Sequence, residues 1–350
     1  MNNTFGTHFT VSTFGESHGN ALGAVIDGIP AGLEIDPDFI RREMDRRRPG
    51  QSSVTTARNE ADRVEILSGV FEGRTTGTPL AMLIRNADQH SGDYRNLAET
   101  FRPGHADYTF EKKFGIRDYR GGGRSSGRET AARVAAGAVA KLLLKHYGIT
   151  VRACAERIGP VCAEKRDWSA AEGNAVRCAD PEAAEKMTQA IHDAMRRQDS
   201  VGGIVYCEIL GVPAGLGEPV FDKFDALLAH AVLSIGGVKG FEIGSGFACA
   251  GMYGSEHNDP ITASGFASNH AGGVLGGISN GDVVCFRAAV KPTPSISREQ
   301  QTVDRNGKEV TMEIKGRHDP CLVPRIIPVV EAMAALVTAD LLLRAGGSRL

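Results

Sequence analysis

Glycine clusters are the sequence feature that most constrains how this chain can fold. Of its 350 residues, 43 are glycine, about 12% of the chain against an average of roughly 7%. Many stand in short runs, as at Gly121–Gly123, Gly236–Gly237 and Gly272–Gly273. Glycine adopts backbone conformations that other residues avoid, so such runs favour tight turns and close approach of the backbone to a ligand. We therefore expect tight loops, some of which contact a ligand.

Composition and charge disfavour several classes of protein. The formal net charge of −2 gives no general attraction to nucleic acid or to anionic membranes. Seven cysteines are scattered without a C-x-x-C pair, which disfavours a disulfide framework or a structural zinc site and fits a reducing cytoplasm. The first residues lack the basic and apolar regions of a signal peptide. We expect one cytoplasmic domain over residues 1–350, without a bound metal.

The order of apolar segments predicts an α+β fold. Asp36 as N-cap and Pro37 at the first helical position predict a helix over 37–48. Strands and helices follow no regular β-α-β alternation, and no G-x-G-x-x-G follows the first strand, which disfavours a Rossmann domain. Because Glu331 and Asp340 interrupt the last helix, 324–343, we expect it to be amphipathic and not membrane-spanning. The other expected elements are strands 22–29, 64–67, 80–84, 149–155, 203–210 and 282–290, and helices 128–146, 181–197 and 222–234.

A short internal echo links the two halves of the chain. Residues 28–33 read GIPAGL and residues 211–216 read GVPAGL, each between an expected strand and an expected helix. The match allows two interpretations, a common turn used twice or two related halves packed around one core. Six residues leave both interpretations open.

Arginine is concentrated in the first part of the chain. Sixteen of the 29 arginines lie between Arg41 and Arg133. The segment 120–130, RGGGRSSGRET, combines arginines, hydroxyls and glycines just before a helix, whose free N–H groups also attract anions. This segment favours a ligand with several negative charges. The run Arg46–Arg48 alone is more typical of a solvated charged surface, and aromatic residues are too few to favour nucleic acid.

Two histidines stand in turns where proton chemistry is favoured. His18 lies in GESHG and His105 in RPGHAD. Imidazole exchanges its proton near neutral pH, and a turn beside glycine or proline is an uncommon place for a core histidine. His270 in SNHAGG is a weaker candidate, and His318 could be structural. GESHG does not match the nucleophile elbow of hydrolases.

Two further segments carry polar groups on a restrained backbone. In Lys291-Pro292-Thr293-Pro294-Ser295, two prolines fix an extended path that presents two hydroxyls. In GRHDPC, residues 316–321, Asp319 could be a catalytic carboxylate or only the N-cap of the last helix. Neither segment has the spacing of metal ligands.

Together these motifs resemble one family, chorismate synthase. The resemblance covers residues 6–344 and rests on three long blocks, with further similarity at 101–110, 268–279 and 291–296. It implies a β-α-β sandwich with helices between antiparallel sheets, and a homotetramer. It also implies 1,4-elimination of phosphate from 5-enolpyruvylshikimate-3-phosphate with reduced FMN and no net redox change. The three blocks are GESHG through VIDGIP (15–30), GGGRSSGRET (121–130) and GRHDPC (316–321).

The resemblance assigns roles by position. His18 would set the protonation of the reduced flavin, His105 would assist departure of phosphate, and Asp319 would act as base. Arg47 matches an arginine at the substrate and NADP end of the pocket. The implied flavin contacts are Arg124, Ser125, Ser126, Gly236, Gly237, Gly276, Lys291, Pro292, Thr293, Pro294, Ser295 and Arg317.

Two positions depart from the family pattern, and two other functions stay open. Ser53 stands where the family usually has arginine, and Gly236–Gly237 replaces Asn-Ala or Pro-Ala. The first change puts one anion contact in doubt, and the second allows only backbone contacts there. A flavin-dependent oxidoreductase is disfavoured by the missing dinucleotide motif. A non-enzymatic anion-binding protein is disfavoured by the paired turn histidines.

Overall fold

The first of two large sheets is built from the N-terminal quarter of the chain. The computed structural model describes residues 3–51, 54–55, 61–86, 97–314 and 318–347. Five antiparallel strands lie in the order β1-β2-β3-β7-β4. In β7, Leu80, Met82 and Ile84 are buried and alternate with more exposed residues, as expected when one face of a sheet covers the core. The strands are β1 (Thr4–Phe5), β2 (Thr10–Gly15), β3 (Ala21–Asp27), β4 (Val64–Ile66) and β7 (Leu80–Arg85).

The second sheet is also antiparallel and comes from residues 150–290. Its order is β11-β16-β10-β8-β9. Val205, Cys207 and Ile209 of β10 point into the core and are fully buried. The strands are β8 (Thr150–Ile158), β9 (Val161–Cys162), β10 (Gly203–Leu210), β11 (Val238–Ile243) and β16 (Val284–Val290).

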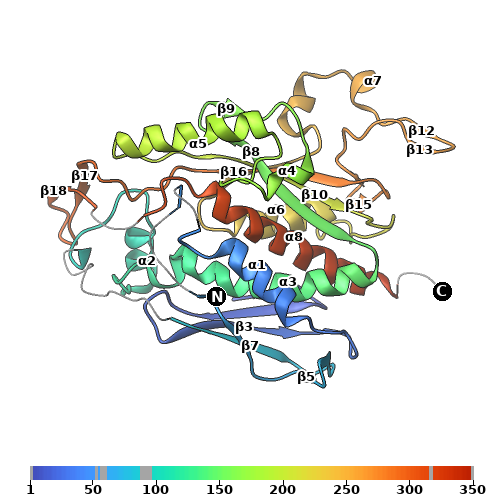
Figure 1. Ribbon diagram of the computed structural model, residues 1–350, viewed down its shortest axis with the longest axis horizontal. Helices are drawn as coiled ribbons and strands as arrows, with labels where there is room; N and C mark the ends of the chain where they lie inside the picture. The colour runs from blue at the N-terminus through green and yellow to red at the C-terminus, as the bar shows by residue number, and fades with distance from the viewer. Residues whose placement is uncertain (1–2, 52–53, 56–60, 87–96, 315–317, 348–350) are drawn as a thin grey trace.

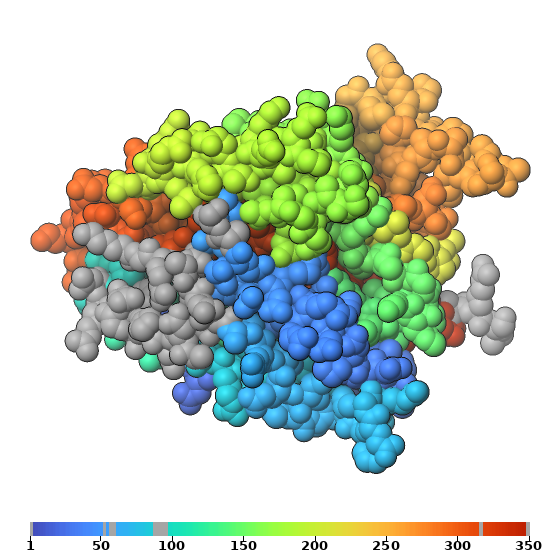
Figure 2. Space-filling model, in the orientation of Figure 1, coloured from blue at the N-terminus to red at the C-terminus, as the bar shows by residue number. Residues whose placement is uncertain are grey.

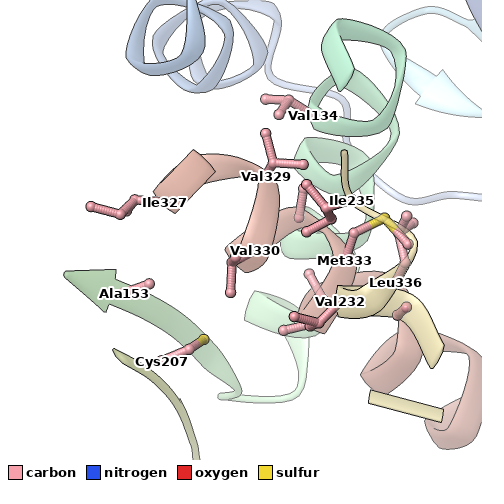
Figure 3. Packing of buried hydrophobic residues seen from close by; sticks show 14 of the residues in the cluster. Val134, Ala153, Cys207, Val232, Ile235, Ile327, Val329, Val330, Met333 and Leu336 are labelled. Atoms are coloured by element: carbon pink, nitrogen blue, oxygen red, sulfur yellow. The ribbon is translucent and has the colours of Figure 1, made fainter. Parts of the chain in front are cut away.

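Helices fill the space between the two sheets (Figure 1). Helix α3 contacts β3, helix α8 contacts β8 and β10, and the two helices contact each other along their length. Gly137 of α3 permits this close crossing, because a Cβ there would lie 2.3 Å from the Cβ of Ala332 in α8. In Figure 3, Val329 of α8 points toward Val134 of α3, and Val330 points toward the second sheet, where Ala153 and Cys207 lie. The helices of this layer are α1 (Pro37–Arg47), α3 (Thr130–His146), α6 (Phe224–Leu233) and α8 (Val323–Ala345).

Helix α8 is buried on nearly all sides, so the expectation of an amphipathic helix was wrong. By length and composition alone it is long and apolar enough to cross a membrane, but 89% of its apolar 18-residue stretch is buried inside the protein. The two interrupting acids are internal hydrogen-bond acceptors. Glu331 binds Arg46 and Lys141, and Asp340 accepts the backbone N–H groups of residues 7–9. Such pairing permits carboxylates to be buried.

The two sheets share a strand order that bears on the internal echo. The order β2-β3-β7-β4 in the first sheet matches β8-β10-β16-β11 in the second. Gly28 follows β3 and Gly211 follows β10, both with positive φ, 80° and 76°. A Cβ at Gly28 would collide with the carbonyl oxygen of His8, just before β2. A Cβ at Gly211 would collide with the carbonyl oxygen of Gly148, just before β8. Each GxPAGL segment therefore occupies the same place beside its own sheet.

Smaller elements lie outside this layered body. The mixture of helices and antiparallel sheets confirms the α+β prediction. Helix α5 (Pro181–Arg196) contacts β8 and β9 of the second sheet. Residues of α7 and the β12–β13 hairpin project away from the body, as Figure 2 shows in orange. The remaining elements are α2 (Asp107–Phe114), α4 (Trp168–Ala171), α7 (Gly254–His257), β5 (Val70–Phe71), β6 (Arg74–Thr75), β12 (Ile261–Thr262), β13 (Gly265–Phe266), β14 (Val274–Leu275), β15 (Ile278–Ser279), β17 (Gln300–Val303) and β18 (Glu309–Met312).

Candidate active site

A cavity of about 760 Å³ opens at the end of the helix layer where α3 and α8 begin. Its walls come from the turn after β2, the glycine run before α3, the end of α6, the segment after β16 and the residues before α8. Its size falls in the upper part of the range of roughly 300–1,000 Å³ found for small-molecule sites. Segments that are distant in the sequence therefore meet in one place.

Positive charge dominates one part of the cavity wall. Glu129 and Asp319 are the only carboxylates among the described lining residues. The cavity also has an apolar lining that comes largely from α8, with Ile326, Val329, Met333 and Leu336. A ligand with both anionic groups and a flat apolar ring would match these two surfaces. The basic lining residues are Arg47, Arg102, Arg124, Arg128, Arg133, Lys291 and Arg325.

Arg47 is held at the end of α1, deep in this wall. Only 1% of its side chain is exposed, and it forms an ion pair with Asp62, which also pairs with Arg128. Burial, together with the charges of Arg325 and Arg128, lowers the pKa of Arg47 to about 10 against the attraction of Asp62. Repulsion among closely placed guanidiniums is relieved when an anion binds between them. This part of the cavity is therefore suited to an anionic ligand.

The glycine run brings backbone against His18. Gly121 has φ of 73°, and a Cβ there would lie 2.5 Å from His18 Nε2, so glycine is required for this approach. The next residue with a charge, Arg124, donates to Thr13 Oγ1 at 2.8 Å and to the carbonyl oxygens of Thr13 and Gly15 at 3.2 Å. Because these acceptors are uncharged, the positive charge of Arg124 stays available to a ligand.

The two serines after Arg124 shape the start of α3. Ser125 Oγ donates to the Gly122 carbonyl at 2.7 Å. Ser126 caps a 3-10 turn that leads into α3, accepting from the N–H of Arg128. These hydroxyls fix the loop in a shape that lines the cavity.

His105 is held between the arginine-rich wall and the segment after β16. Its Nε2 lies 2.7 Å from Ser295 Oγ, and Lys291 Nζ donates to the neighbouring Gly104 carbonyl at 2.7 Å. Burial and the charge of Arg102 together lower the pKa of His105 to about 3, while Asp107 opposes the shift. His105 is therefore a neutral imidazole near pH 7.

Asp319 lies next to His318 in the same cavity and does not cap the last helix. Helix α8 has Leu322 as N-cap, with no side-chain hydrogen bond there. Asp319 instead forms an ion pair with Arg325. The N-cap interpretation is therefore wrong, and the carboxylate is held at the cavity.

His318, for which the sequence suggested only a structural role, lines the cavity. Burial lowers its pKa, with the charge of Arg102 adding to the effect, so it is also neutral near pH 7. Its Nε2 is buried and has no hydrogen-bond partner among the described residues. Its sequence neighbour Asp319 was the only signal that could have marked it.

Most of the predicted site residues meet in this cavity, and a few do not. Gly276 turns the β14–β15 hairpin and Pro292 lies beside Gly202, and neither lines the cavity. Arg317 and Ser53 lie outside the described residues. The site roles therefore stay predictions, including that of Gly276. The predicted residues that line the cavity are Arg47, His18, His105, Asp319, Arg124, Ser125, Ser126, Gly236, Gly237, Lys291, Thr293, Pro294 and Ser295.

The weaker candidate His270 lies elsewhere. Its Nδ1 is 3.1 Å from Asp259 Oδ1, and it lines a smaller hollow on the outer side of the second sheet. It does not line the large cavity.

Several buried polar atoms of the cavity lack hydrogen-bond partners among the described residues, as expected where a polar cofactor and substrate bind. Within the described parts of the chain, Ser17 Oγ, Thr293 Oγ1, Arg47 Nε and His318 Nε2 are buried without a hydrogen-bond partner, and all four residues line the cavity. Buried polar atoms are normally hydrogen-bonded, so such a cluster indicates where a ligand binds. The same described residues contain no group of three or more potential metal ligands. The fold and site together define an enzyme for a small molecule with several negative charges.

Comparison with known proteins narrows this class. Residues 9–343 match the family model described as chorismate synthase. A chorismate synthase of Nitratidesulfovibrio vulgaris is 56% identical over 341 residues, which are 97% of this chain and 96% of that protein. One from Archaeoglobus fulgidus is 57% identical over 353 residues, with 98% of each covered. A crystal structure of a chorismate synthase superposes with a TM-score of 0.78 at 32% identity, covering 98% of this chain and 94% of the other. The chain belongs to the chorismate synthase family.

Proposed function

We propose that this protein forms chorismate by eliminating phosphate from 5-enolpyruvylshikimate-3-phosphate, with reduced FMN as cofactor. As a family member it is a carbon–oxygen lyase of aromatic amino-acid biosynthesis. One observation carries the proposal for the site. His18, His105 and Asp319, which are far apart in the sequence, line one cavity with the basic residues.

The charges of the cavity support this substrate. The ester carries a phosphate and two carboxylates, and guanidinium groups bind both kinds of anion through paired hydrogen bonds. Arg47, whose buried Nε has no hydrogen-bond partner among the residues that the structure describes, would bind part of this charge together with Arg128 and Arg325. Arg102 is already bound by Asp107 at 2.8 Å, so it acts mainly by orienting the His105 loop.

Reduced FMN, when bound, would supply electron density as phosphate leaves and recover it as the C6 proton is removed. Arg124, Ser125, Ser126 and the backbone of Gly236–Gly237 would hold it, and α8 offers the apolar wall for its ring system. His18, fixed against Gly121, would hold a proton beside it. The protein's contribution is then binding, orientation and control of protons.

Two groups are placed to handle the protons of the elimination. The C–O bond to phosphate breaks and the C6–H bond breaks, so one proton must be supplied near the phosphate and one removed from carbon. His105 is neutral in the free protein, and a bound phosphate dianion would raise its pKa and favour its role as acid. Asp319, paired with Arg325, would accept the C6 proton.

We further infer the finer features of architecture and assembly that the resemblance implies. One hydrophobic cluster contains residues of both sheets and of α1, α3, α6 and α8, which supports a single domain with the layering of a β-α-β sandwich. The matching strand orders support two related halves. Exposed apolar side chains, at Phe221 (89%) and Phe247 (85%), support self-association as a homotetramer. Seven free cysteines support a cytoplasmic location.

The test is anaerobic incubation of the purified protein with the ester and reduced FMN, following phosphate, chorismate and the flavin spectrum. We expect phosphate and chorismate in equal amounts, with many turnovers per flavin and no net flavin oxidation. Stoichiometric flavin oxidation would indicate an oxidoreductase, and absence of turnover would indicate an anion-binding protein. Because no dinucleotide motif is present, oxidised FMN with NADPH alone should not sustain turnover.

A further inference from the structure

Asp62 lies behind the arginine-rich wall of the cavity. Its side chain is completely buried, and it shares its two carboxylate oxygens between two arginines. Nη2 of Arg47 donates to Oδ2, and Nη1 of Arg128 donates to Oδ1. Both arginines line the cavity, whereas Asp62 does not. The carboxylate therefore acts on the cavity only through the two guanidiniums.

This arrangement determines which nitrogen donors of the Arg47 guanidinium remain for a ligand. One end of the guanidinium is occupied by Asp62. Among the described residues, Nη1 has only long contacts, 3.4 Å to Thr130 Oγ1 and 3.5 Å to the Gly127 carbonyl. Nε is buried and has no hydrogen-bond partner in the described chain. Arg47 thus keeps donors for an oxyanion while its orientation is fixed from behind.

Arg128 extends the same network to the turn that carries His18. Its Nε donates to Asn86 Oδ1 at 3.0 Å. Asn86 Nδ2 in turn donates to the carbonyl oxygens of Glu16 at 3.0 Å and Gly19 at 2.7 Å, which bracket His18. Three successive side chains, Asp62, Arg128 and Asn86, therefore connect Arg47 at the end of α1 with the turn that carries His18.

We propose that Asp62 is a positioning residue, which holds Arg47 and Arg128 in the orientation that binds the anionic groups of the phosphate ester. This rests on the substrate proposed above. Asp62 does not contact the substrate itself. Fixing the two guanidiniums before binding saves the conformational entropy that two free arginine side chains would lose. At metal sites, groups that orient the ligands from behind typically contribute about 10–100-fold to affinity or activity, and we expect an effect of this order for Asp62.

Simple electrostatics makes the opposite prediction, which gives the proposal a sharp test. Removing a negative charge behind the cavity would raise its positive potential and should tighten binding of a polyanion. If positioning dominates, removal of Asp62 must weaken binding instead. The sign of the change therefore distinguishes the two effects.

The experiment compares Asp62→Asn and Asp62→Ala with Glu331→Gln. Glu331 is a matched control, because it is also a buried carboxylate shared by two cations, Arg46 and Lys141, but lies outside the cavity. We would measure the Kd of the ester by calorimetry on flavin-free protein, and KM and kcat with reduced FMN. For both Asp62 variants we expect Kd and KM to rise by about 10–100-fold with a much smaller change in kcat. Glu331→Gln should lower stability without changing Kd.

Formate provides a readout that a purely structural role would not move. In Asp62→Ala it can occupy the space of the lost carboxylate between the two guanidiniums, so millimolar formate should lower the KM of this variant. In the wild type and in Glu331→Gln it should not. Unchanged or tighter ester binding in both Asp62 variants would overturn the proposal. Failure of both variants to fold, or loss of affinity that formate does not restore, would also overturn it. Turnover of the wild type in the same assay tests the proposed function separately.

Discussion

His105 Nε2 lies 2.7 Å from the Ser295 hydroxyl, although 190 residues separate the two in sequence. Ser295 belongs to the extended segment that follows β16, and His105 to the turn before α2. The contact fixes the imidazole at the cavity wall, while burial and Arg102 hold its pKa near 3. A histidine that is neutral and oriented before substrate arrives can gain a proton only when a negative charge is placed beside it.

This environment makes stability depend on pH between about 6.5 and 5. The pKa of His105 is lowered from 6.5 to about 3, and that of His318 is also lowered, so below pH 6.5 the unfolded chain binds more protons than the folded one. The free energy of unfolding should therefore fall as pH falls from about 6.5 to 5, before most carboxylates titrate. Urea denaturation of the wild type at pH 7 and pH 5 measures this loss.

In His105→Gln the loss should be smaller. Replacing His146, which lies at the exposed end of α3, should leave the loss unchanged. An equal fall in stability in the wild type and in His105→Gln would show that His105 is not a neutral buried group.

Arg124→Ala should weaken binding of reduced FMN. Arg124 bonds to uncharged oxygens at the cavity wall, so its charge is free to pair with an anion. Loss of one charge-assisted hydrogen bond costs about 1.5–3 kcal/mol, which corresponds to roughly a ten- to hundredfold rise in Kd. Fluorescence titration under anaerobic conditions measures this. Arg120→Ala is the control, because Arg120 is paired with Asp118 and does not line the cavity, and an equal effect there would contradict the assignment.

Gly121→Ala should impair the site more than it impairs the fold. A Cβ at Gly121 would meet His18 Nε2 at 2.5 Å, so the imidazole would be displaced. Gly115 has almost the same φ, 72° against 73°, but a Cβ there would meet nothing within 4 Å. Both substitutions should cost about 1–2 kcal/mol of stability from the left-handed backbone. Only Gly121→Ala should also reduce turnover, and equal turnover in the two variants would mean that His18 needs no such support.

Local patterns were enough to predict most of the elements. The N-cap Asp36 does accept from the Phe39 N–H, and α1 ends one residue before the predicted limit. Strand β10 matches its predicted range, because its apolar residues are bounded by turn residues on both sides. Helix α8 was misjudged, because the partners that permit Glu331 and Asp340 to be buried come from α1, α3 and the N-terminal segment. Sequence alone does not reveal such distant pairing.

The same distinction holds for the site: residues in local motifs could be predicted from the sequence, and residues that depend on distant partners could not. His18, His105 and Asp319 stand in distinctive motifs and meet in one cavity. Asp62 has no local signal, because its importance comes from two arginines 15 and 66 residues away. Gly276 belongs to a glycine-rich motif, but the hairpin that carries it does not line the cavity.

The most direct test of the account is single-turnover phosphate release by His105→Ala and Asp319→Ala. Both groups are assigned to protons that move only during the reaction, so their loss should affect the transition state more than binding. We expect nearly unchanged Kd values for both ligands and, at saturating reduced FMN and ester, a rate lowered by about 10²–10⁴-fold. Because Asp319 caps no helix, both variants should fold. Release of phosphate at the wild-type rate by either variant would contradict the role assigned to that residue.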